Sequence, residues 1–417
     1  MVDYNGDCTF DVKSIADTFP GKSIIHSDKH ISIQLSEYKN VVDWFESQAL
    51  YRLVLLPDNL YDFISRARSK PDYTRFEGIQ VYHHLRDYQK KLLWDLLCLG
   101  GRGFNLSEMG TGKTIVAIGF IEYYGTDNVL VVCPSSTRQN MVNEIRRFTS
   151  HEVTLIKTTR TPLSNGINVI SFDMVRALPK RKVWNTIIVD ESHYVKNLAA
   201  KRTKALLQIS KTAGHMLLMS GTPLSKPVEL YSQLKSLYPS VFRLFSQFTR
   251  FSKKPTDVAT PYFFGDRYCK PTRVYVGKGS HIMYEYKGSE RLTELNAILK
   301  SVSIRCKKAD VLHLPPKHRR TRYVNSLDFK TSRSQLERIE ILRKGVGQMV
   351  ANREVSKLVR EHSACKLPFV LAYIKNLVNE HILKNSREKH ILFAHHLSYI
   401  HACAEVLTEM DMDFIQI

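Results

Sequence analysis

Short apolar runs alternate with segments of helical periodicity over much of the first 240 residues. Four runs are apolar on both faces and rich in β-branched residues, at 128–134, 167–172, 185–192 and 215–223. Such runs are typical of strands buried in a parallel sheet. Apolar residues at helical spacing lie between or before them, at 85–97, 113–124, 135–148 and 197–209. The alternation predicts an α/β fold with a doubly wound parallel sheet.

The alternation stops between residues 240 and 330, where the chain is aromatic and basic, and a helical pattern then covers 330–362. The α/β pattern returns with predicted helices at 365–378 and 397–410 and predicted strands at 390–395 and 414–417. A single strand-helix-strand unit cannot bury both faces of a parallel sheet. We therefore expect this last part to be the start of a larger, incomplete unit.

The charge is strongly one-sided, with 61 Lys and Arg residues against 40 Asp and Glu residues and a formal net charge of +21. Such a surface attracts polyanions, so nucleic acid is the first candidate partner and an anionic membrane surface the second. A solvated basic surface with no function is the plain alternative. The hydrophobic fraction of 43% argues against global disorder.

Neither a membrane-spanning run nor a signal peptide is recognisable in the sequence. The seven cysteines are scattered singly, which argues against a zinc site and against a disulfide framework. We expect an intracellular protein that is not secreted and not bound to a membrane. In a eukaryote its compartment would be the nucleus, and otherwise the cytoplasm.

The stretch "SEMGTGKT" at 107–114 matches the end of a phosphate-binding loop, although Ser107 stands where the general pattern has glycine. Small residues let backbone N–H groups turn toward phosphates, and the N-terminus of the next helix points at them. Lys113 would neutralise the β- and γ-phosphates, and the Thr114 hydroxyl would ligate Mg²⁺. An ordinary glycine-rich turn is the alternative. The residues expected to bind ATP are Gln89, which would read the adenine edge, and Glu108, Met109, Gly110, Thr111, Gly112, Lys113 and Thr114.

Two carboxylates follow the apolar run at 185–189, where the carboxyl edge of a parallel sheet binds ligands. Asp190 is expected to hold Mg²⁺, and Glu191 to orient and deprotonate the attacking water. A solvated turn is the alternative for such a pair. The next strand ends in Ser220, Gly221 and Thr222, and this order of motifs predicts a nucleotide-hydrolysing site.

The ordered motifs resemble the first motor lobe of Swi/Snf-type helicase-like ATPases of superfamily two. They read "LRDYQ", "SEMGTGKT", "VVCPSS", "VISFD", "VDESHYVKN", "LMSGTP" and "ELYSQL". The further stretches "FGDRYC", "YKGSERLTELNAIL" and "KADVLHLPPKHRR" look most like the annealing-helicase (HARP) branch. The resemblance implies two RecA-like lobes that clamp ATP with Mg²⁺ and step along duplex DNA.

The resemblance also implies roles for individual residues. Coupling between nucleotide and DNA is expected from His193, Ser220, Gly221 and Thr222. Contacts with DNA are expected from Pro134, Ser135, Ser136, Ser171, Lys196, Asn197 and Lys308. Pro134 to Ser136 would cap the following helix in any case, so a structural role is the alternative there. Lys308 lies in the basic segment 305–322, which matches the connector between lobes, and Cys306 stands in it where arginine is usual. We expect that departure to weaken lobe coupling or DNA contact.

These considerations predict four parts. Residues 1–80 form an accessory region, either a degenerate HARP-like domain or an unrelated α+β cap, and 81–240 form the ATP-binding RecA-like lobe. Residues 241–330 form a basic and helical insertion with the connector, and 331–417 the start of the second lobe. The late helix that carries the family's arginine finger is not recognisable, so the chain is expected to be a fragment, a truncated copy or an artificially shortened protein.

Three functions remain open at this level. The first is an ATP-dependent translocase or annealing helicase that acts on forked or partly unpaired DNA in replication-fork repair. The second is a nucleotide-responsive DNA-binding module that does not hydrolyse ATP. The third is a chromatin remodeller of the same superfamily, and an RNA helicase fits the motifs less well. Protein partners, DNA structure preference and polarity of movement cannot be inferred from the sequence.

Overall fold

The computed structural model describes residues 68–179, 181–221, 226–239, 261–276, 281–316, 348–383 and 389–416, with short pieces at 23–27, 30–33, 39–40, 43, 319, 321, 337 and 340. The chain divides into two compact units, Met1–Leu314 and Pro315–Ile417. The boundary between these units differs from those of the four parts expected from the sequence, and that division into four parts stays a prediction.

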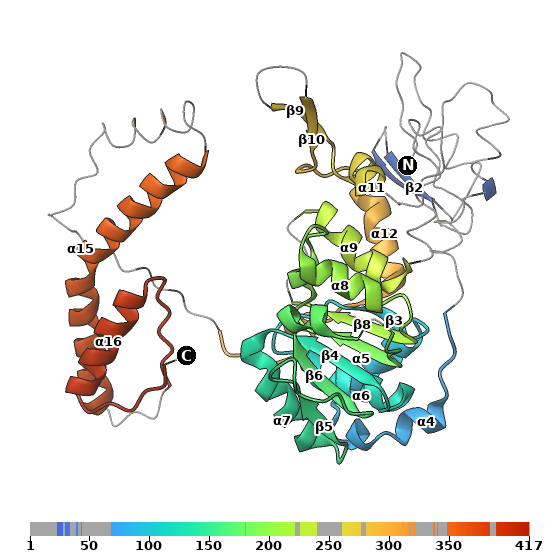
Figure 1. Cartoon of the computed structure of the whole chain (residues 1–417), viewed down its shortest axis with the longest axis horizontal. Coiled ribbons are helices and arrows are strands. Elements are labelled where there is room, and N and C mark those ends of the chain that lie inside the picture. Colours follow the sequence, from blue (N-terminus) through green and yellow to red (C-terminus); the bar gives the residue numbers. More distant parts are fainter. Residues whose placement is uncertain are drawn as a thin grey trace. The chain divides into compact units, whose positions relative to one another are not determined.

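A seven-stranded sheet forms the centre of the first unit (Figure 1). Its strands are β3 (Arg102–Asn105), β4 (Val129–Cys133), β5 (Val153–Leu155), β6 (Ile167–Ser171), β7 (Thr186–Val189), β8 (His215–Met219) and β11 (Ser303–Ile304). Their order is β11-β3-β8-β7-β4-β6-β5, and every neighbouring pair is parallel. The predicted α/β fold with a parallel sheet is confirmed.

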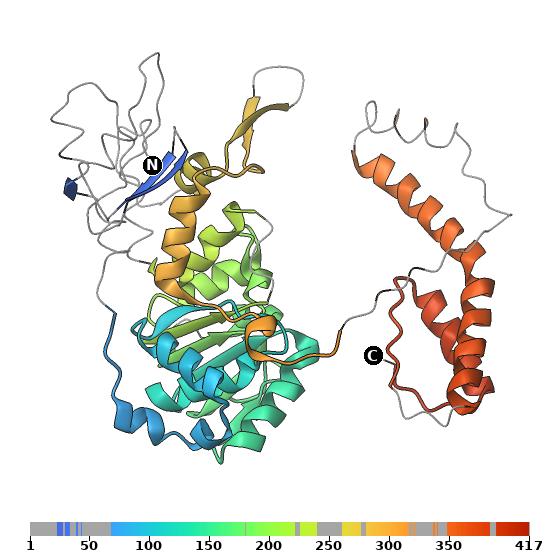
Figure 2. The ribbon, with the colours of Figure 1, turned by 180° about the vertical axis from the view of Figure 1, so that it is seen from behind.

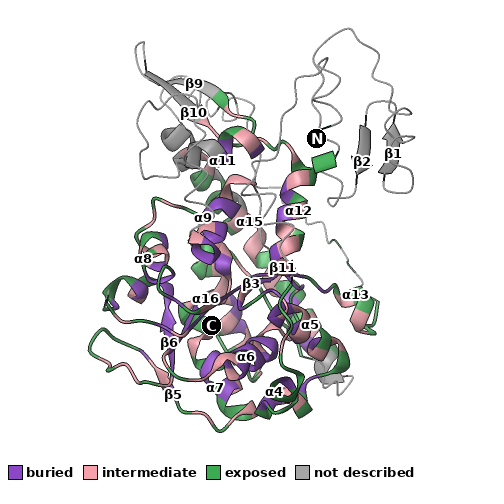
Figure 3. Ribbon diagram, turned by 90° about the vertical axis from the view of Figure 1, so that its right-hand side faces the viewer, coloured by how far each residue is buried: buried purple, intermediate pink, exposed green. Residues whose placement is uncertain are grey.

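Helices cover both faces of this sheet, as seen from the two sides in Figures 1 and 2. One face packs against α5 (Asp87–Leu97), α6 (Lys113–Tyr124) and α7 (Arg138–Phe148). The other packs against η4 (Phe172–Ala177), α8 (Lys201–Ile209), α9 (Val228–Leu237), α11 (Pro261–Tyr268) and α12 (Leu292–Val302). The buried residues follow the strands and the helix faces turned toward them (Figure 3).

Strand β4 shows why its sequence is apolar at every position. Val129, Val131 and Cys133 pack into the layer of α5, α6 and α7, whereas Leu130 and Val132 pack into the opposite layer. Successive side chains of a strand point to opposite faces, so a central strand covered on both sides needs apolar residues throughout. The predicted strands at 128–134, 167–172, 185–192 and 215–223 are confirmed, with shorter bounds.

Three strands of the sheet were not predicted. β3 and β5 are short, and their sequences "RGFN" and "VTL" carry little apolar signal. β11 comes from the stretch 241–330, in which no alternation was recognised, and it pairs with β3 at the edge of the sheet. The same stretch holds the antiparallel pair β9 (Thr272–Val276) and β10 (His281–Glu285) and the short helix α13 (Lys308–Val311).

The described part of the second unit consists of two helices. α15 (Gln348–Leu383) is one continuous helix with Pro368 inside it, whereas the sequence predicted two separate helical segments. α16 (Leu397–Glu409) confirms the predicted helix at 397–410. The two helices share a small apolar cluster that includes Ile374, Val378, Cys403 and Val406.

Two predicted strands of the second unit are wrong. Residues 390–395 and 414–416 have no strand structure. Their large apolar side chains are open to solvent, with Ile391 79%, Phe393 89% and Ile415 89% exposed. A strand forms only when a neighbouring strand takes its backbone hydrogen bonds, and the described residues of this unit contain no such neighbour.

Most of the accessory region lies outside the described residues, so its predicted nature stays a prediction. Within it, β1 (Ser23–Ser27) and β2 (His30–Ile33) form an antiparallel pair. Among the described helices, none is long and apolar enough to cross a membrane. The cysteines in the described part are free thiols, at Cys98, Cys133, Cys269, Cys306, Cys365 and Cys403.

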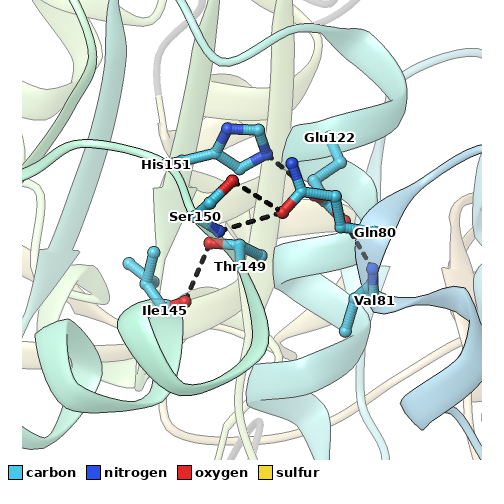
Figure 4. Close-up of polar contacts among 7 residues, drawn as sticks. All are labelled: Gln80, Val81, Glu122, Ile145, Thr149, Ser150 and His151. Atoms are coloured by element: carbon cyan, nitrogen blue, oxygen red, sulfur yellow. Dashed lines mark hydrogen bonds and ion pairs between the residues drawn. The ribbon is translucent and has the colours of Figure 1, made fainter.

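A polar cluster fastens the segment before α5 to the lobe (Figure 4). The Glu122 carboxylate on α6 accepts the Val81 backbone N–H at 3.0 Å and lies 2.8 Å from His151 Nε2. The Gln80 side-chain oxygen accepts both the backbone N–H and the hydroxyl of Ser150. The cluster therefore joins η2 (Gln80–His84), the end of α6 and the residues after α7.

Candidate nucleotide-binding site

Three motifs lie at the carboxyl ends of three neighbouring strands. The phosphate-binding loop (107–114) follows β3, Asp190 follows β7, and Ser220 follows β8, which lies between the other two strands in the sheet. Parallel strands bring their carboxyl ends to one edge, so residues far apart in sequence meet there. The sheet order therefore explains why these motifs form one site.

The phosphate-binding loop has the backbone shape that anion binding requires. Gly110 and Gly112 have φ values of 82° and 80°, in the left-handed region that favours glycine. Helix α6 begins at Lys113, so its free N–H groups face the loop. The Lys113 ammonium donates to the carbonyls of Ser107 at 3.2 Å and Glu108 at 3.3 Å, which holds it over the loop.

Gln89 braces the loop from α5. Its Nε2 donates to the Thr111 carbonyl at 3.2 Å, and its Oε1 accepts the Arg86 N–H at 3.0 Å. A Cβ on Gly112 would lie 2.2 Å from Gln89 Nε2, so this position cannot carry a larger residue without moving the glutamine. The amide is buried and has these partners within the protein, and its predicted contact with adenine stays a prediction.

The carboxylates follow β7 in an unusual backbone conformation. Glu191 adopts φ 51° and ψ 55°, a left-handed conformation that costs a non-glycine residue about 1–3 kcal/mol. Glu191 Oε2 lies 3.2 Å from His193 Nδ1 and 3.4 Å from the Ser220 hydroxyl, and His193 Nδ1 lies 3.2 Å from the same hydroxyl. The structure thus brings together Glu191 with two of the residues expected to couple nucleotide to DNA.

Burial dominates the electrostatics of the site. It lowers the pKa of Lys113, and the nearby Glu191 and Asp190 oppose this shift. Burial also raises the pKa of Asp190, as does the charge of Glu191. Because these charged groups are partly buried, they interact more strongly with a charged ligand than they would in bulk water.

The turn after β8 approaches the phosphate-binding loop closely. A Cβ on Gly221 would lie 2.7 Å from Met109 Cγ and 3.4 Å from the Lys113 ammonium. A side chain at this position would therefore have to displace Met109. The Met109 side chain is 53% exposed. Thr222, the last residue predicted for this turn, lies outside the described residues.

The residues present fit a magnesium nucleotide. Left-handed glycines, a helix N-terminus and Lys113 suit a polyphosphate, while a carboxylate and a hydroxyl are oxygen ligands of the kind Mg²⁺ prefers. Thr114 is in the first turn of α6, and Asp190 comes directly after β7. These two residues would hold the metal ion.

The predicted DNA contacts after β4 and at the end of β6 lie at the same edge of the sheet, and the predicted contacts differ in exposure. Ser135 and Ser136 follow β4 and are exposed, with Pro134 partly buried beside them. Ser171 ends β6 and is only 4% exposed. Asn197 is exposed, and its side-chain oxygen accepts the Ala199 N–H at 2.9 Å.

Two of the predicted DNA-binding lysines have other neighbours. Lys196 forms an ion pair of 3.0 Å with Glu229 on α9. Lys308 lies against the phosphate-binding loop, where a Cβ on Gly110 would come within 3.4 Å of its ammonium. The roles of both residues in DNA binding stay predictions.

Sequence reasoning missed the residues that support the loop from behind. Asn105 at the end of β3 accepts the Ser107 N–H through its side chain, and the Ser107 hydroxyl accepts the N–H of Cys306. The serine in place of the usual glycine was a signal for such a bond. Nothing in the sequence pointed to Cys306 as its partner, because almost two hundred residues separate them.

Comparisons with known proteins agree with this architecture. Residues 91–369 match the family model of the SNF2-related domain. The SWI/SNF-related matrix-associated actin-dependent regulator of chromatin subfamily A-like protein 1 of Xenopus tropicalis is 33% identical over 331 residues, which are 76% of this chain and 32% of that protein. The human DNA annealing helicase and endonuclease ZRANB3 is 29% identical over 382 residues, which are 86% of this chain and 32% of that protein.

One similar solved structure is the SWI2/SNF2 ATPase core of Sulfolobus solfataricus in complex with double-stranded DNA. The two chains are 17% identical, and their superposition has a TM-score of 0.45 and covers 78% of this chain and 70% of the Sulfolobus chain. The chain spans about a third of the length of the curated relatives it matches. The predicted resemblance to Swi/Snf-type ATPases is confirmed by the domain match and by these relatives. Since the matched domain covers more than half of the sequence, the chain belongs to the SNF2-related family.

Proposed function

We propose that this chain contains the nucleotide-binding lobe of a DNA-dependent ATPase that moves along or rewinds DNA. The observation that carries the proposal is the meeting of Lys113, Glu191 and Ser220 at the ends of β3, β7 and β8. Lys113 would neutralise phosphate charge, and the helix dipole of α6 would add to it. Bound Mg²⁺ would supply further charge neutralisation on the phosphates.

Glu191 is the proposed base for the attacking water. Its Oε2 has a hydrogen bond from Ser220 and lies beside His193, so its position is fixed by two side chains from the end of β8 and the start of η5 (Ser192–Val195). Phosphoryl transfer depends on such positioning and on charge neutralisation. A change at Glu191 when ATP becomes ADP would reach Ser220 directly, which supports a coupling role for this pair.

DNA is the proposed partner, and forked or partly unpaired DNA the proposed substrate class. The net charge of +21 supports a polyanionic partner, since cationic residues on a polyanion release counterions on binding. The human relative ZRANB3 is a DNA annealing helicase and endonuclease by name, which supports an annealing role for this chain. A function in replication-fork repair belongs to the same proposal. In a eukaryotic cell such a protein would act in the nucleus.

The test is ATP hydrolysis by the 417-residue chain with and without forked DNA, beside Lys113→Ala and Glu191→Gln. We expect DNA to raise turnover, and both variants to lower it by at least 100-fold. Lys113→Ala loses the charge that neutralises the phosphates, and Glu191→Gln loses the base for the attacking water. Glu191→Gln should still bind ATP.

If DNA and ATP bind but turnover does not exceed that of the variants, the chain is a nucleotide-responsive binding module. If ATP does not bind, the proposed nucleotide site is wrong.

A further inference from the structure

The segment after α12 is hydrogen-bonded along the phosphate-binding loop. The parallel pairing of β11 with β3 continues beyond the strands as a series of four bonds. These are Leu106 N–H to the Ile304 carbonyl at 2.9 Å, Cys306 N–H to the Ser107 hydroxyl at 3.2 Å, Glu108 N–H to the Cys306 carbonyl at 3.0 Å, and Lys308 N–H to Glu108 Oε2 at 2.9 Å. The series fixes the backbone of residues 304–308 against the loop and ends at Lys308.

The side chain of Lys308 reaches the loop glycine. A Cβ built on Gly110 would lie 3.3 Å from Lys308 Cε and 3.4 Å from its ammonium, so the lysine packs directly against this residue. Gly110 has the left-handed backbone that turns loop N–H groups toward an anion. The ammonium therefore lies beside a turn of the kind that binds phosphate.

Two ammonium groups of like charge share this loop. Lys113 lies over it from the start of α6, and the charge of Lys308 contributes to lowering the pKa of Lys113. Among the described residues, no carboxylate forms an ion pair with the Lys308 ammonium. The like charges of the two lysines repel each other, and a bound polyphosphate would attract both of them.

We propose that Lys308 is a second lysine of the nucleotide site, which contacts the phosphates of the nucleotide held at Gly110–Thr114, in place of the DNA contact expected from the sequence. The inference rests on the proposed nucleotide site. It adds Lys308 to that site, although this residue lies outside the phosphate-binding loop in the sequence. A lysine ammonium has three donors on a flexible stem, which suits a phosphate group.

The experiment measures affinity for ATP and for ADP without DNA, by titration calorimetry on the 417-residue chain. Lys308→Met should weaken ATP affinity about tenfold, the effect expected for one hydrogen bond to a charged group. Lys307→Met is the matched control, because it removes the same charge from an exposed neighbour, and it should change ATP affinity less than twofold. Lys308→Arg should restore most of the affinity, which would show that the loss in Lys308→Met is one of charge and not of folding.

A parallel titration follows binding of duplex DNA by fluorescence anisotropy in the absence of nucleotide. Equal DNA affinities for Lys308→Met and Lys307→Met support the proposal. The proposal is overturned if Lys308→Met binds ATP as well as Lys307→Met does, or if its principal loss is in DNA affinity.

Lys113→Ala separates this inference from the proposed function. If wild-type protein binds no ATP, both fall. If wild-type protein binds ATP, Lys113→Ala loses it, and Lys308→Met does not, only the role of Lys308 falls.

Discussion

Individual residues at the site are held in conformations that the rest of the lobe imposes. Glu191 has a left-handed backbone although it is not glycine, and its carboxylate is fixed by His193 and Ser220. Gly112 and Gly221 allow contacts that a Cβ would block. Strain of this kind persists only where surrounding packing determines it, and it is concentrated at functional sites.

The substitution Gly112→Ala tests whether the close approach of Gln89 requires glycine at position 112. The added Cβ would meet Gln89 Nε2 at 2.2 Å and would also need a φ of 80°, so the loop must move away from Gln89. We expect ATP affinity to fall at least tenfold, as measured by calorimetry, and the free energy of unfolding to fall by about 1–3 kcal/mol.

Gly110→Ala is the control, because it has a similar φ of 82° but would meet only the flexible end of Lys308 at 3.3 Å. It should lose less ATP affinity than Gly112→Ala. Equal losses would mean that backbone strain alone, and not the contact with Gln89, sets the requirement for glycine.

At the scale of elements, hydrogen bonds outside the sheet decide where the phosphate-binding loop and its supporting segments lie. The bonds from 304–308 to the loop hold one side of it. On the far end of α6, the buried Glu122 carboxylate holds η2 and the segment after α7 through Val81 and His151 (Figure 4). Helix α6 is thus fixed at both of its ends.

Glu122→Ala tests this anchoring. The side chain of Glu122 is 4% exposed, so its removal leaves the Val81 N–H and the His151 ring without their acceptor. We expect the free energy of unfolding, measured by urea denaturation, to fall by about 2–4 kcal/mol.

Glu144→Ala is the matched control, because Glu144 lies 3.9 Å from Arg147 in a surface pair. It should change the free energy of unfolding by less than about 0.5 kcal/mol. A comparable loss in both variants would contradict an anchoring role for Glu122.

At the scale of the whole molecule, the described residues of the nucleotide site all belong to the unit Met1–Leu314, including Lys308. The described part of the other unit has its own small core between α15 and α16. We therefore expect the unit Met1–Leu314 to bind ATP by itself, whereas DNA-stimulated hydrolysis can depend on both units.

A chain shortened to 1–314 tests that division. We expect it to bind ATP within about twofold of the 417-residue chain, because it keeps each hydrogen bond described at the loop. Calorimetry with ATP, and near-ultraviolet circular dichroism to verify native packing, are the measurements. DNA-stimulated hydrolysis should decrease, because the resemblance to Swi/Snf-type ATPases implies that two lobes act on ATP. A folded 1–314 chain that binds no ATP would show that the site requires residues beyond 314.

The sequence by itself determined the parallel sheet, its four central strands and the identity of the loop and carboxylates, because those strands are buried on both faces and the motifs are local. It overpredicted strands at 390–395 and 414–417, where the described residues of the second unit offer no strand for pairing. It did not predict β3, β5 and β11, because these strands are too short to show a recognisable pattern of apolar residues. Only the tertiary structure decided that Cys306 and Lys308 lie at the phosphate-binding loop, because the pairing of β11 with β3 joins residues that no sequence periodicity connects.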